Sequence, residues 1–105
     1  MIDEIRDVAN LDRTIHEPAR LVIVAILSVV AEADFLYLLR ETGLTKGNLS
    51  AHLSRLEDAG YVRIEKTFRG KLPQTLCRLT DAGRHAFTHY RQTLKRALEI
   101  LPATM

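Results

Sequence analysis

The stretch that decides the fold is "TKGNLSAHLSRLEDAGYV", residues 45–62. Its leucines recur at helical spacing, and a rotation of about 100° per residue groups them within about 60° of each other. We expect these leucines, Leu49, Leu53 and Leu56, to face the core. The opposite face is made of small residues flanked by two longer polar ones: Gly47, Ser50, Ala51 and Ser54, with Asn48 and Arg55 beside them. Gly47 lowers the helix propensity by about 1 kcal/mol relative to alanine, so it is not there to stabilise the helix. A face of small residues instead allows another surface to approach the helix closely.

Local signals on both sides of this stretch predict two consecutive helices. Thr45 is a suitable N-cap for a helix over 46–59, and Gly60 ends that helix. A shorter helix over 35–42 precedes it, begins after the N-cap Asp34 and carries the apolar stripe Phe35, Leu38 and Leu39. Gly43 ends the shorter helix, so only a very tight turn separates the two. This arrangement over 35–59 is the helix-turn-helix signature.

A β-hairpin follows the second helix. After Gly60 the apolar period changes from 3.6 to 2, which predicts a half-buried strand over 61–68. Residues 69–74, "RGKLPQ", are typical of a turn, and "TLCRL" at 75–79 predicts the returning strand. We therefore expect a hairpin over 61–79.

Further helices are predicted on either side of this unit. A lead-in helix is expected over 2–11 and a second helix over 18–31, where Pro18 stands in the first turn. The β-branched residues of 18–31 would also suit a strand, and the length and the proline favour the helix. A last helix is expected from Thr80 and Asp81 to about residue 101, with the apolar stripe Phe87, Tyr90, Leu94, Leu98 and Leu101.

The length and the charge of the chain limit which class of protein it can belong to. Its 105 residues fit one domain over 1–105, with 47% hydrophobic and 27% charged residues. Residues 1–52 hold five Lys/Arg and eight Asp/Glu, a net charge of −3, whereas residues 53–105 hold ten and five, a net charge of +5. A basic half suits a polyanionic partner, although an ordinary solvated surface could look the same.

Two further features point to a protein of the cytoplasm. The lone Cys77 cannot form an internal disulfide and fits a reducing compartment. The apolar run at 21–31, "LVIVAILSVVA", is too short to span a bilayer and does not follow a basic N-terminus, so we expect a helix buried on most sides, with no membrane anchor and no signal peptide.

The small face of the helix over 46–59 meets the needs of a DNA major groove. That groove is about 12 Å wide and must admit a helix with its side chains. Asn48 and Arg55 are of the types that make bidentate contacts to adenine and guanine edges. Arg69 and Lys71 surround Gly70 at the hairpin tip, where a basic loop can follow the phosphates or enter the minor groove. A charge-poor solvated helix and a hairpin charged only to protect its edges remain alternatives.

Three segments in this order resemble the MarR/ArsR-like winged helix transcriptional regulators. "NLSAHLSRLEDAGYV" (48–62) resembles their recognition helix and first wing strand, "RLTDAGRHAF" (78–87) their exit from the wing, and "HEPARLVIVAIL" (16–27) the helix that opens the domain. The resemblance covers roughly residues 11–90. It implies a mainly α fold with a small β-hairpin wing, in which a three-helix core is joined by N- and C-terminal helices.

The resemblance also implies a homodimeric regulator that binds specific double-stranded DNA, with the recognition helix in the major groove and the wing over 68–74 on the backbone or minor groove. Together with the helix face, it indicates these DNA-binding residues: Thr45, Lys46, Gly47, Asn48, Ser50, Ala51, Ser54, Arg55, Arg69 and Lys71. Dimerisation is expected through the N-terminal helix and the helix over 80–101, whose apolar stripes exceed what so small a chain covers. A monomer in which both helices fold back over residues 18–31 is the alternative. No cofactor is expected, and no effector is identified.

The sequence evidence for other kinds of site is weaker. His85 and His89 have a spacing that can place two imidazoles on one metal, but nothing nearby completes a ligand set, and "DFLYLLRETG" lacks the cysteine pair of many ArsR-like metal sensors. We expect Cys77 to face the core beneath the wing. His52 is expected to be a half-buried histidine at the edge of the core, and a contact from His52 to a phosphate is the alternative. No phosphate loop, nucleophile elbow or catalytic triad indicates an enzyme. A winged helix that serves as a protein-interaction module in a larger assembly is the alternative function.

Overall fold

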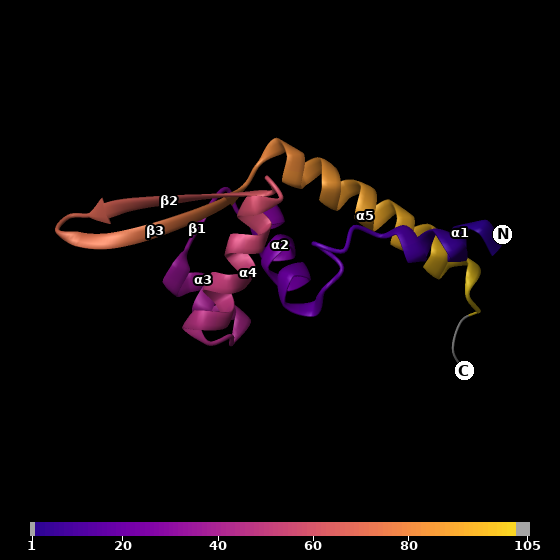
Figure 1. The fold of residues 1–105 in the computed structure, drawn as a ribbon, viewed down its shortest axis with the longest axis horizontal. Coiled ribbons are helices and arrows are strands. Elements are labelled where there is room, and N and C mark those ends of the chain that lie inside the picture. Colours follow the sequence, from indigo (N-terminus) through magenta and orange to yellow (C-terminus); the bar gives the residue numbers. More distant parts are fainter. Residues whose placement is uncertain (1, 103–105) are drawn as a thin grey trace.

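The computed structural model describes residues 2–102 of the protein. Its elements follow one another in this order: α1 (Ile2–Arg6), a 3-10 helix η1 (Asp7–Asn10), α2 (Pro18–Val29), β1 (Ala33–Asp34), α3 (Phe35–Thr42), α4 (Lys46–Asp58), β2 (Val62–Arg69), β3 (Leu72–Leu79) and α5 (Asp81–Ile100). The molecule is elongated, 56 × 30 × 21 Å, with the β2–β3 hairpin and α5 extending toward opposite ends (Figure 1). The predicted fold class, a mainly α winged helix with a small hairpin, is confirmed. The predicted domain of residues 1–105 also includes residues 1 and 103–105, which lie outside the described residues.

Both helices of the helix-turn-helix begin at their predicted N-cap residues. The Asp34 carboxylate accepts a hydrogen bond from the Tyr37 amide at 2.7 Å and starts α3. The Thr45 hydroxyl accepts one from the Asn48 amide at 3.2 Å and starts α4. Between the two helices, Gly43 adopts φ 69°, the left-handed conformation that glycine accepts without a steric penalty. The turn therefore needs only residues 43–45, as the sequence predicted.

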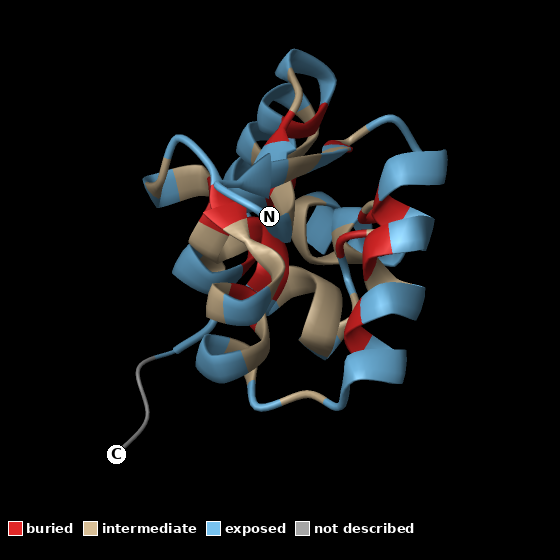
Figure 2. Cartoon of the chain, turned by 90° about the vertical axis from the view of Figure 1, so that its left-hand side faces the viewer, coloured by how far each residue is buried: buried red, intermediate tan, exposed pale blue. Residues whose placement is uncertain are grey.

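One apolar core joins these helices to the base of the sheet. It consists of buried side chains from α2, β1, α3, α4, β2 and β3 (Figure 2): Ile23, Val24, Leu27, Ala33, Leu38, Leu49, Leu53, Leu56, Val62, Cys77 and Leu79. The three leucines of α4 are at most 2% exposed, so the face predicted for the core is the buried one. Burying this stripe fixes which face of α4 remains available to a partner.

A second, smaller cluster connects the segment before α2 to α5. Leu11 and Ile15 pack with Tyr90 of α5. Polar groups surround this cluster: His16 Nδ1 lies 2.8 Å from the Tyr90 hydroxyl, and the Tyr61 hydroxyl donates to the Asp12 carboxylate. That hydrogen bond, with some burial, raises the pKa of Tyr61 to about 12. The sequence analysis assigned no such role to Asp12, His16 or Tyr61.

The three strands form an antiparallel sheet in the order β1–β3–β2. The register places Val62 opposite Leu79 at the base of the hairpin and Arg69 opposite Leu72 at its tip. The predicted turn over 69–74 is therefore too long, because Gly70, with φ 63°, closes the hairpin with Lys71 alone. Pro73 belongs to β3. A proline, which has no amide N–H to donate, is tolerated there because the outer edge of β3 pairs with β1 only at Leu76 and Cys77.

Several other boundaries differ from the predictions. The strand β1 was not predicted, because two residues are too few to show a period. The lead-in helix predicted over 2–11 divides into α1 and η1. The helix predicted over 18–31 ends at Val29, because Val30 is extended with φ −120° and ψ 152°.

Apolar residues are exposed on one side of α2 and at the end of α5. As predicted, α2 is buried on most sides, and Val22 and Val29 are exposed on one of them. On α5, Tyr90 is buried, whereas Leu98 and, just past the end of the helix, Leu101 are 58% and 50% exposed because the far end of α5 extends past the helical core. Instead, α5 buries Thr93 and Ala97 there, where α1 and η1 lie against it. Across residues 2–102, no helix has both the length and the apolar character that crossing a bilayer requires.

Candidate nucleic-acid interface

The predicted recognition face of α4 is open to solvent. Thr45 and all seven predicted residues within α4 are exposed: Lys46, Gly47, Asn48, Ser50, Ala51, Ser54 and Arg55. No atom lies within 4 Å of the position that a Gly47 Cβ would take, so nothing in residues 2–102 requires a glycine there. The longer side chains, Lys46, Asn48 and Arg55, make no hydrogen bond or ion pair with another described residue. The structure thus presents a small, polar helix face with free donors.

A groove separates one flank of this face from the hairpin. It encloses about 540 Å³ and is lined from α4 by Ser50, Leu53, Ser54 and Glu57, from the hairpin by Ile64, Lys66 and Thr75, and from α3 by Phe35. The groove combines apolar walls with three hydroxyls, one carboxylate and one ammonium group. The predicted residues Ser50 and Ser54 therefore share one surface with the hairpin.

The other flank of α4 faces the segment before α2. A hollow of about 470 Å³ is lined by Arg13, Thr14, Arg20, Arg55, Asp58 and Ala59. Arg55 therefore lies apart from Ser50 and Ser54, on the side of the helix where Arg13 is its basic neighbour. Arg13 was not among the predicted residues, since an isolated arginine between predicted helices carries no pattern that would single it out.

Arg20 has a structural role in this hollow. Its guanidinium donates to the backbone oxygen of Thr14 at 2.6 Å and lies 3.3 Å from the Glu17 carboxylate. His52 Nδ1 lies 3.1 Å from an Arg20 nitrogen and 3.2 Å from Glu17 Oε2, so one ring nitrogen is shared between a donor and an acceptor. Glu17 Oε2 is buried and gains a hydrogen bond when His52 carries its proton on Nδ1. This cluster ties α4 to the start of α2, which confirms His52 as a half-buried histidine at the core edge.

The hairpin, residues 62–79, carries five Lys/Arg and one Asp/Glu. Arg69 and Lys71 are exposed on either side of Gly70 at its tip, and neither side chain has a hydrogen-bond or ion-pair partner among residues 2–102. Lys66 lies farther toward the base and lines the groove beside α4. The charge of the hairpin therefore extends from its tip to the flank of the recognition face.

The base of the hairpin is held by the start of α5. Thr80 donates from its amide to the backbone oxygen of Tyr61 at 3.0 Å and from its hydroxyl to that of Gly60 at 2.6 Å. Gly83 lies so close to the backbone just before β2 that a Cβ would come within 2.2 Å of the Tyr61 oxygen. The start of α5 therefore packs directly against the backbone at the base of the hairpin.

The sequence model of the winged helix DNA-binding domain matches residues 19–98. The chain belongs to this family. The match begins in α2, passes through the helix-turn-helix and the hairpin, and ends near the end of α5.

Relatives of this winged helix protein support the assignment. An uncharacterised protein of Methanocaldococcus jannaschii is 37% identical over 71 residues, which cover 68% of this chain and 77% of that protein. The structure of a transcriptional regulator homologue from Pyrococcus horikoshii is 27% identical with a TM-score of 0.84, covering 92% of this chain and 95% of that one. The transcriptional repressor BigR from Xylella fastidiosa is 26% identical with a TM-score of 0.63, covering 93% and 91%. The predicted resemblance to MarR/ArsR-like regulators is confirmed, and in these comparisons the β2–β3 hairpin is the wing.

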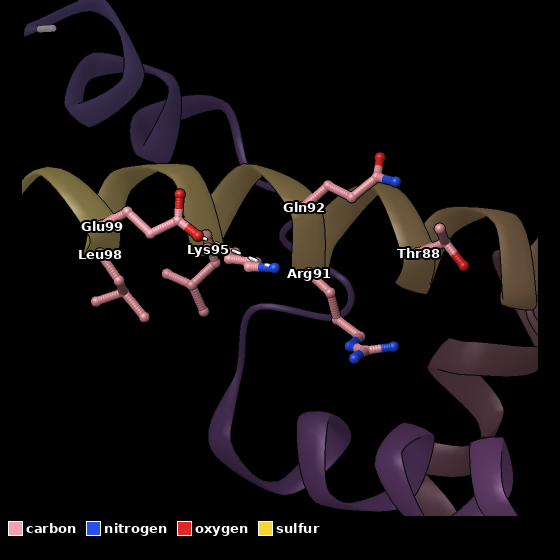
Figure 3. Close-up of a pocket in the computed structure, with 7 residues that line it drawn as sticks. Thr88, Arg91, Gln92, Lys95, Leu98 and Glu99 are labelled. Atoms are coloured by element: carbon pink, nitrogen blue, oxygen red, sulfur yellow. Dashed lines mark ion pairs between the residues drawn. The ribbon is translucent and has the colours of Figure 1, made fainter.

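Another hollow of the winged helix protein lies away from α4. It encloses about 730 Å³ along one side of α5, where Arg91 and Leu98 project (Figure 3). Leu94 also lines it, and Lys95 forms an ion pair with Glu99 at 3.9 Å beside it. Because all of its lining residues come from one helix, the hollow is an uncovered helix face.

The residues considered for metal binding are separated. His85 and His89 are exposed on α5, whereas Cys77 is buried beneath the wing as predicted. Within residues 2–102 no three His, Cys, Asp or Glu side chains are grouped so that they could hold a metal ion. Burial raises the pKa of the Cys77 thiol to about 11, and the carboxylates of Asp34 and Glu57 add to this shift. The thiol is therefore held in its protonated, unreactive form.

Proposed function

We propose that this winged helix protein is a transcriptional regulator of the cytoplasm that binds specific sequences in double-stranded DNA. The observation that carries the proposal is the open face of α4. Its leucines are buried, and its opposite side is small and polar, with long side chains that have no hydrogen-bond or ion-pair partner among residues 2–102. A major groove requires such a face, because the backbone of the helix must come close to the base edges.

In this proposal each part of the surface has a separate role. Asn48, Ser50 and Arg55 contact base edges, while the first turn, Thr45 and Lys46, contacts a phosphate with the positive end of the helix dipole. The wing over 68–74 lies on the backbone or in the minor groove, where Arg69 and Lys71 neutralise phosphates. Gly47, Ala51 and Ser54 contribute chiefly by being small.

We also propose that two copies bind one operator. Leu98 near the end of α5, Leu101 just after it and Ile2 of α1 are exposed apolar residues. Figure 1 shows α1 beside the far end of α5, and Leu98 also lines the hollow along α5. A second copy that covers this end would form a two-fold dimer. Its half-sites are then expected about one helical turn, or about 10 bp, apart.

The main experiment selects bound sequences from a random duplex pool and measures stoichiometry by light scattering. The proposal predicts an enriched two-fold motif, one dimer per site and retention on random duplex at low salt with release as salt rises. A protein that ignores duplex DNA at low salt would refute the proposal and favour the alternative, a protein-interaction module.

Two arginines in the hollow beside α4 separate base contacts from phosphate contacts. Arg55→Ala is expected to cost about 1–3 kcal/mol of binding free energy on the selected site and to relax the preference at one position, because a base contact is lost. The matched variant Arg13→Ala is expected to weaken selected and random duplexes equally, since a phosphate contact carries no sequence information. Binding measured on both duplexes checks the pair, and equal weakening by Arg55→Ala would remove Arg55 from base recognition.

A further inference from the structure

The side chain of Arg20 is mostly buried, although it carries the charge that a DNA-binding surface needs. It is 11% exposed, and each nitrogen of its guanidinium has a partner within the protein. Nε donates to the backbone oxygen of Thr14 at 2.6 Å, and Nη2 donates to that of Arg13 at 3.4 Å. Nη1 lies 3.1 Å from His52 Nδ1 and 3.3 Å from the Glu17 carboxylate. Arg20 is therefore occupied in holding other parts of the protein.

The contacts of Arg20 join a turn to the recognition helix. Arg13 and Thr14 belong to this turn, and the Asp12 carboxylate shapes it by accepting from the Thr14 amide at 2.9 Å. The guanidinium that holds the two backbone oxygens of the turn starts from α2 and also reaches His52 of α4. Asp12 thus gives the turn its shape, and Arg20 sets its place relative to α4.

The held turn presents Arg13 beside the recognition helix. The Arg13 side chain is exposed and has no hydrogen-bond or ion-pair partner among residues 2–102, whereas its backbone oxygen accepts from Arg20. With Arg55 it lines the hollow of about 470 Å³ on the flank of α4. Asp58 adds a single carboxylate there, so the two exposed arginines leave a net positive charge that suits a phosphate.

We propose that Arg20 is a positioning residue for DNA binding, which touches no DNA and holds Arg13 where its guanidinium meets a phosphate beside α4. This role rests on the proposed function, in which Arg13 contacts a phosphate. Binding orders an arginine on a loose loop at an entropic cost, both in its side chain and in its backbone. A turn whose backbone oxygens are already held has lost that backbone freedom on folding, so the phosphate contact costs less.

The test removes the contacts of Arg20 and keeps its charge. In Arg20→Lys a single ammonium cannot replace a guanidinium fork that reaches several acceptors in different directions. This variant is expected to bind random duplex about fivefold more weakly at about 0.15 M salt and to lower the slope of log affinity against log salt by about one, because the phosphate contact of Arg13 is lost. Arg13→Ala should have the same effect. The double variant should bind no more weakly than either single one, since both changes remove the same contact.

Lys71→Ala is the matched control in this cycle. Lys71 is exposed on the wing, whereas Arg20 lines the hollow on the other flank of α4. Combined with Arg20→Lys, its loss should multiply to about 25-fold, because the two sites are independent. Urea denaturation checks that each variant is folded. If Arg20→Lys does not fold, Glu17→Gln replaces it, since it removes the charge that Arg20 pairs with, keeps an oxygen for the Ala19 amide, and should be non-additive with Arg13→Ala in the same way.

The outcomes separate this role of Arg20 from the proposed function. If the wild-type protein binds no duplex, both fail. If it binds and the losses from Arg13→Ala and Arg20→Lys multiply, Arg20 acts independently of Arg13 and the positioning role alone fails. An unchanged affinity or an unchanged salt slope in Arg20→Lys would overturn it as well, because no phosphate contact would have been lost. Arg13→Ala without any effect would also overturn it, since there would be no contact to position.

Discussion

The base and the tip of the wing share the same strands but differ in what their side chains do. At the base, Val62 pairs with Leu79 and both are buried between α2 and α4. At the tip, Phe68 and Leu72 are each 70% exposed, and Figure 1 shows the end of the hairpin extending away from the helices. The strands alternate with the same period throughout, so the difference comes from what packs against each half.

This difference separates stability from binding within one hairpin. A two-stranded hairpin by itself is at best marginally stable in water, and here the base obtains its stability from the helical core. The tip is thereby held in place without having to contribute to the core. Substitutions at the base should therefore change the free energy of unfolding, and those at the tip should change DNA binding.

The largest effect is expected where α5 holds the base. Gly83→Ala should destabilise the protein by about 3–4 kcal/mol, because its Cβ would meet the backbone oxygen of Tyr61 at 2.2 Å and the backbone must shift. Urea denaturation measures this loss. Gly47→Ala is the control, since the same methyl group meets nothing within 4 Å and should stabilise α4 by about 0.5–1 kcal/mol. Equal stability of the two variants would contradict the close contact at Gly83.

A pair of leucines on β3 tests the comparison directly. Leu79→Ala should cost about 2–3 kcal/mol in the free energy of unfolding, because it leaves a cavity at the base of the wing. Leu72→Ala should change that free energy by less than about 0.5 kcal/mol, since Leu72 is exposed at the tip. Thermal and urea denaturation of both variants check this. A large loss for Leu72→Ala would mean that the tip contributes to the core after all.

The buried thiol at the base predicts a dependence on pH. Because burial raises the pKa of Cys77 to about 11, the folded state holds the thiol proton more tightly than the unfolded state, in which the pKa is about 8.5. The stability that this provides is present below about pH 8.5 and is lost as the pH rises toward about 11. Between about pH 8 and pH 10 the wild-type protein should therefore lose about 1–2 kcal/mol more than Cys77→Ala. Parallel denaturation curves for the two proteins would show that the thiol is not shielded.

The smallest effect on folding is expected at the end of the tip. Lys71→Ala should leave the free energy of unfolding unchanged, because this exposed side chain has no hydrogen-bond or ion-pair partner among the described residues. It should reduce the slope of log affinity against log salt by about one, the signature of one lost phosphate contact. Binding at several salt concentrations measures the slope, and an unchanged slope would remove Lys71 from the interface.

The elements with strong local signals were predicted closely. The caps Asp34 and Thr45 and the turn at Gly43 lie where the sequence placed them, since each depends on a few neighbouring residues. The leucine stripe of α4 predicted both its buried face and its open one. The extent of the hairpin was less accurate because Pro73 is typical of turns, and only the pairing of β3 with its neighbours shows that its missing amide is tolerated.

Contacts between segments distant in the chain could not be predicted from the sequence. Nothing in the sequence indicates that Asp12 accepts from Tyr61 or that His52 contacts Arg20 and Glu17, because these contacts join residues more than 30 positions apart in the chain. The position of Arg55 beside Arg13 is of the same kind. The sequence could assign Arg55 to the flank of a helix but not the partner that flank would face.

By itself the sequence determined the helices, the tight turn and the face of α4 that excludes large side chains, because periodicity, capping and glycine conformation act over a few residues. The tertiary structure decided which half of the wing is buried, where Gly83 must stay small and which apolar residues remain uncovered at the tip and on α5. Those outcomes depend on packing between segments distant in the chain, and packing is fixed only when the whole fold has formed.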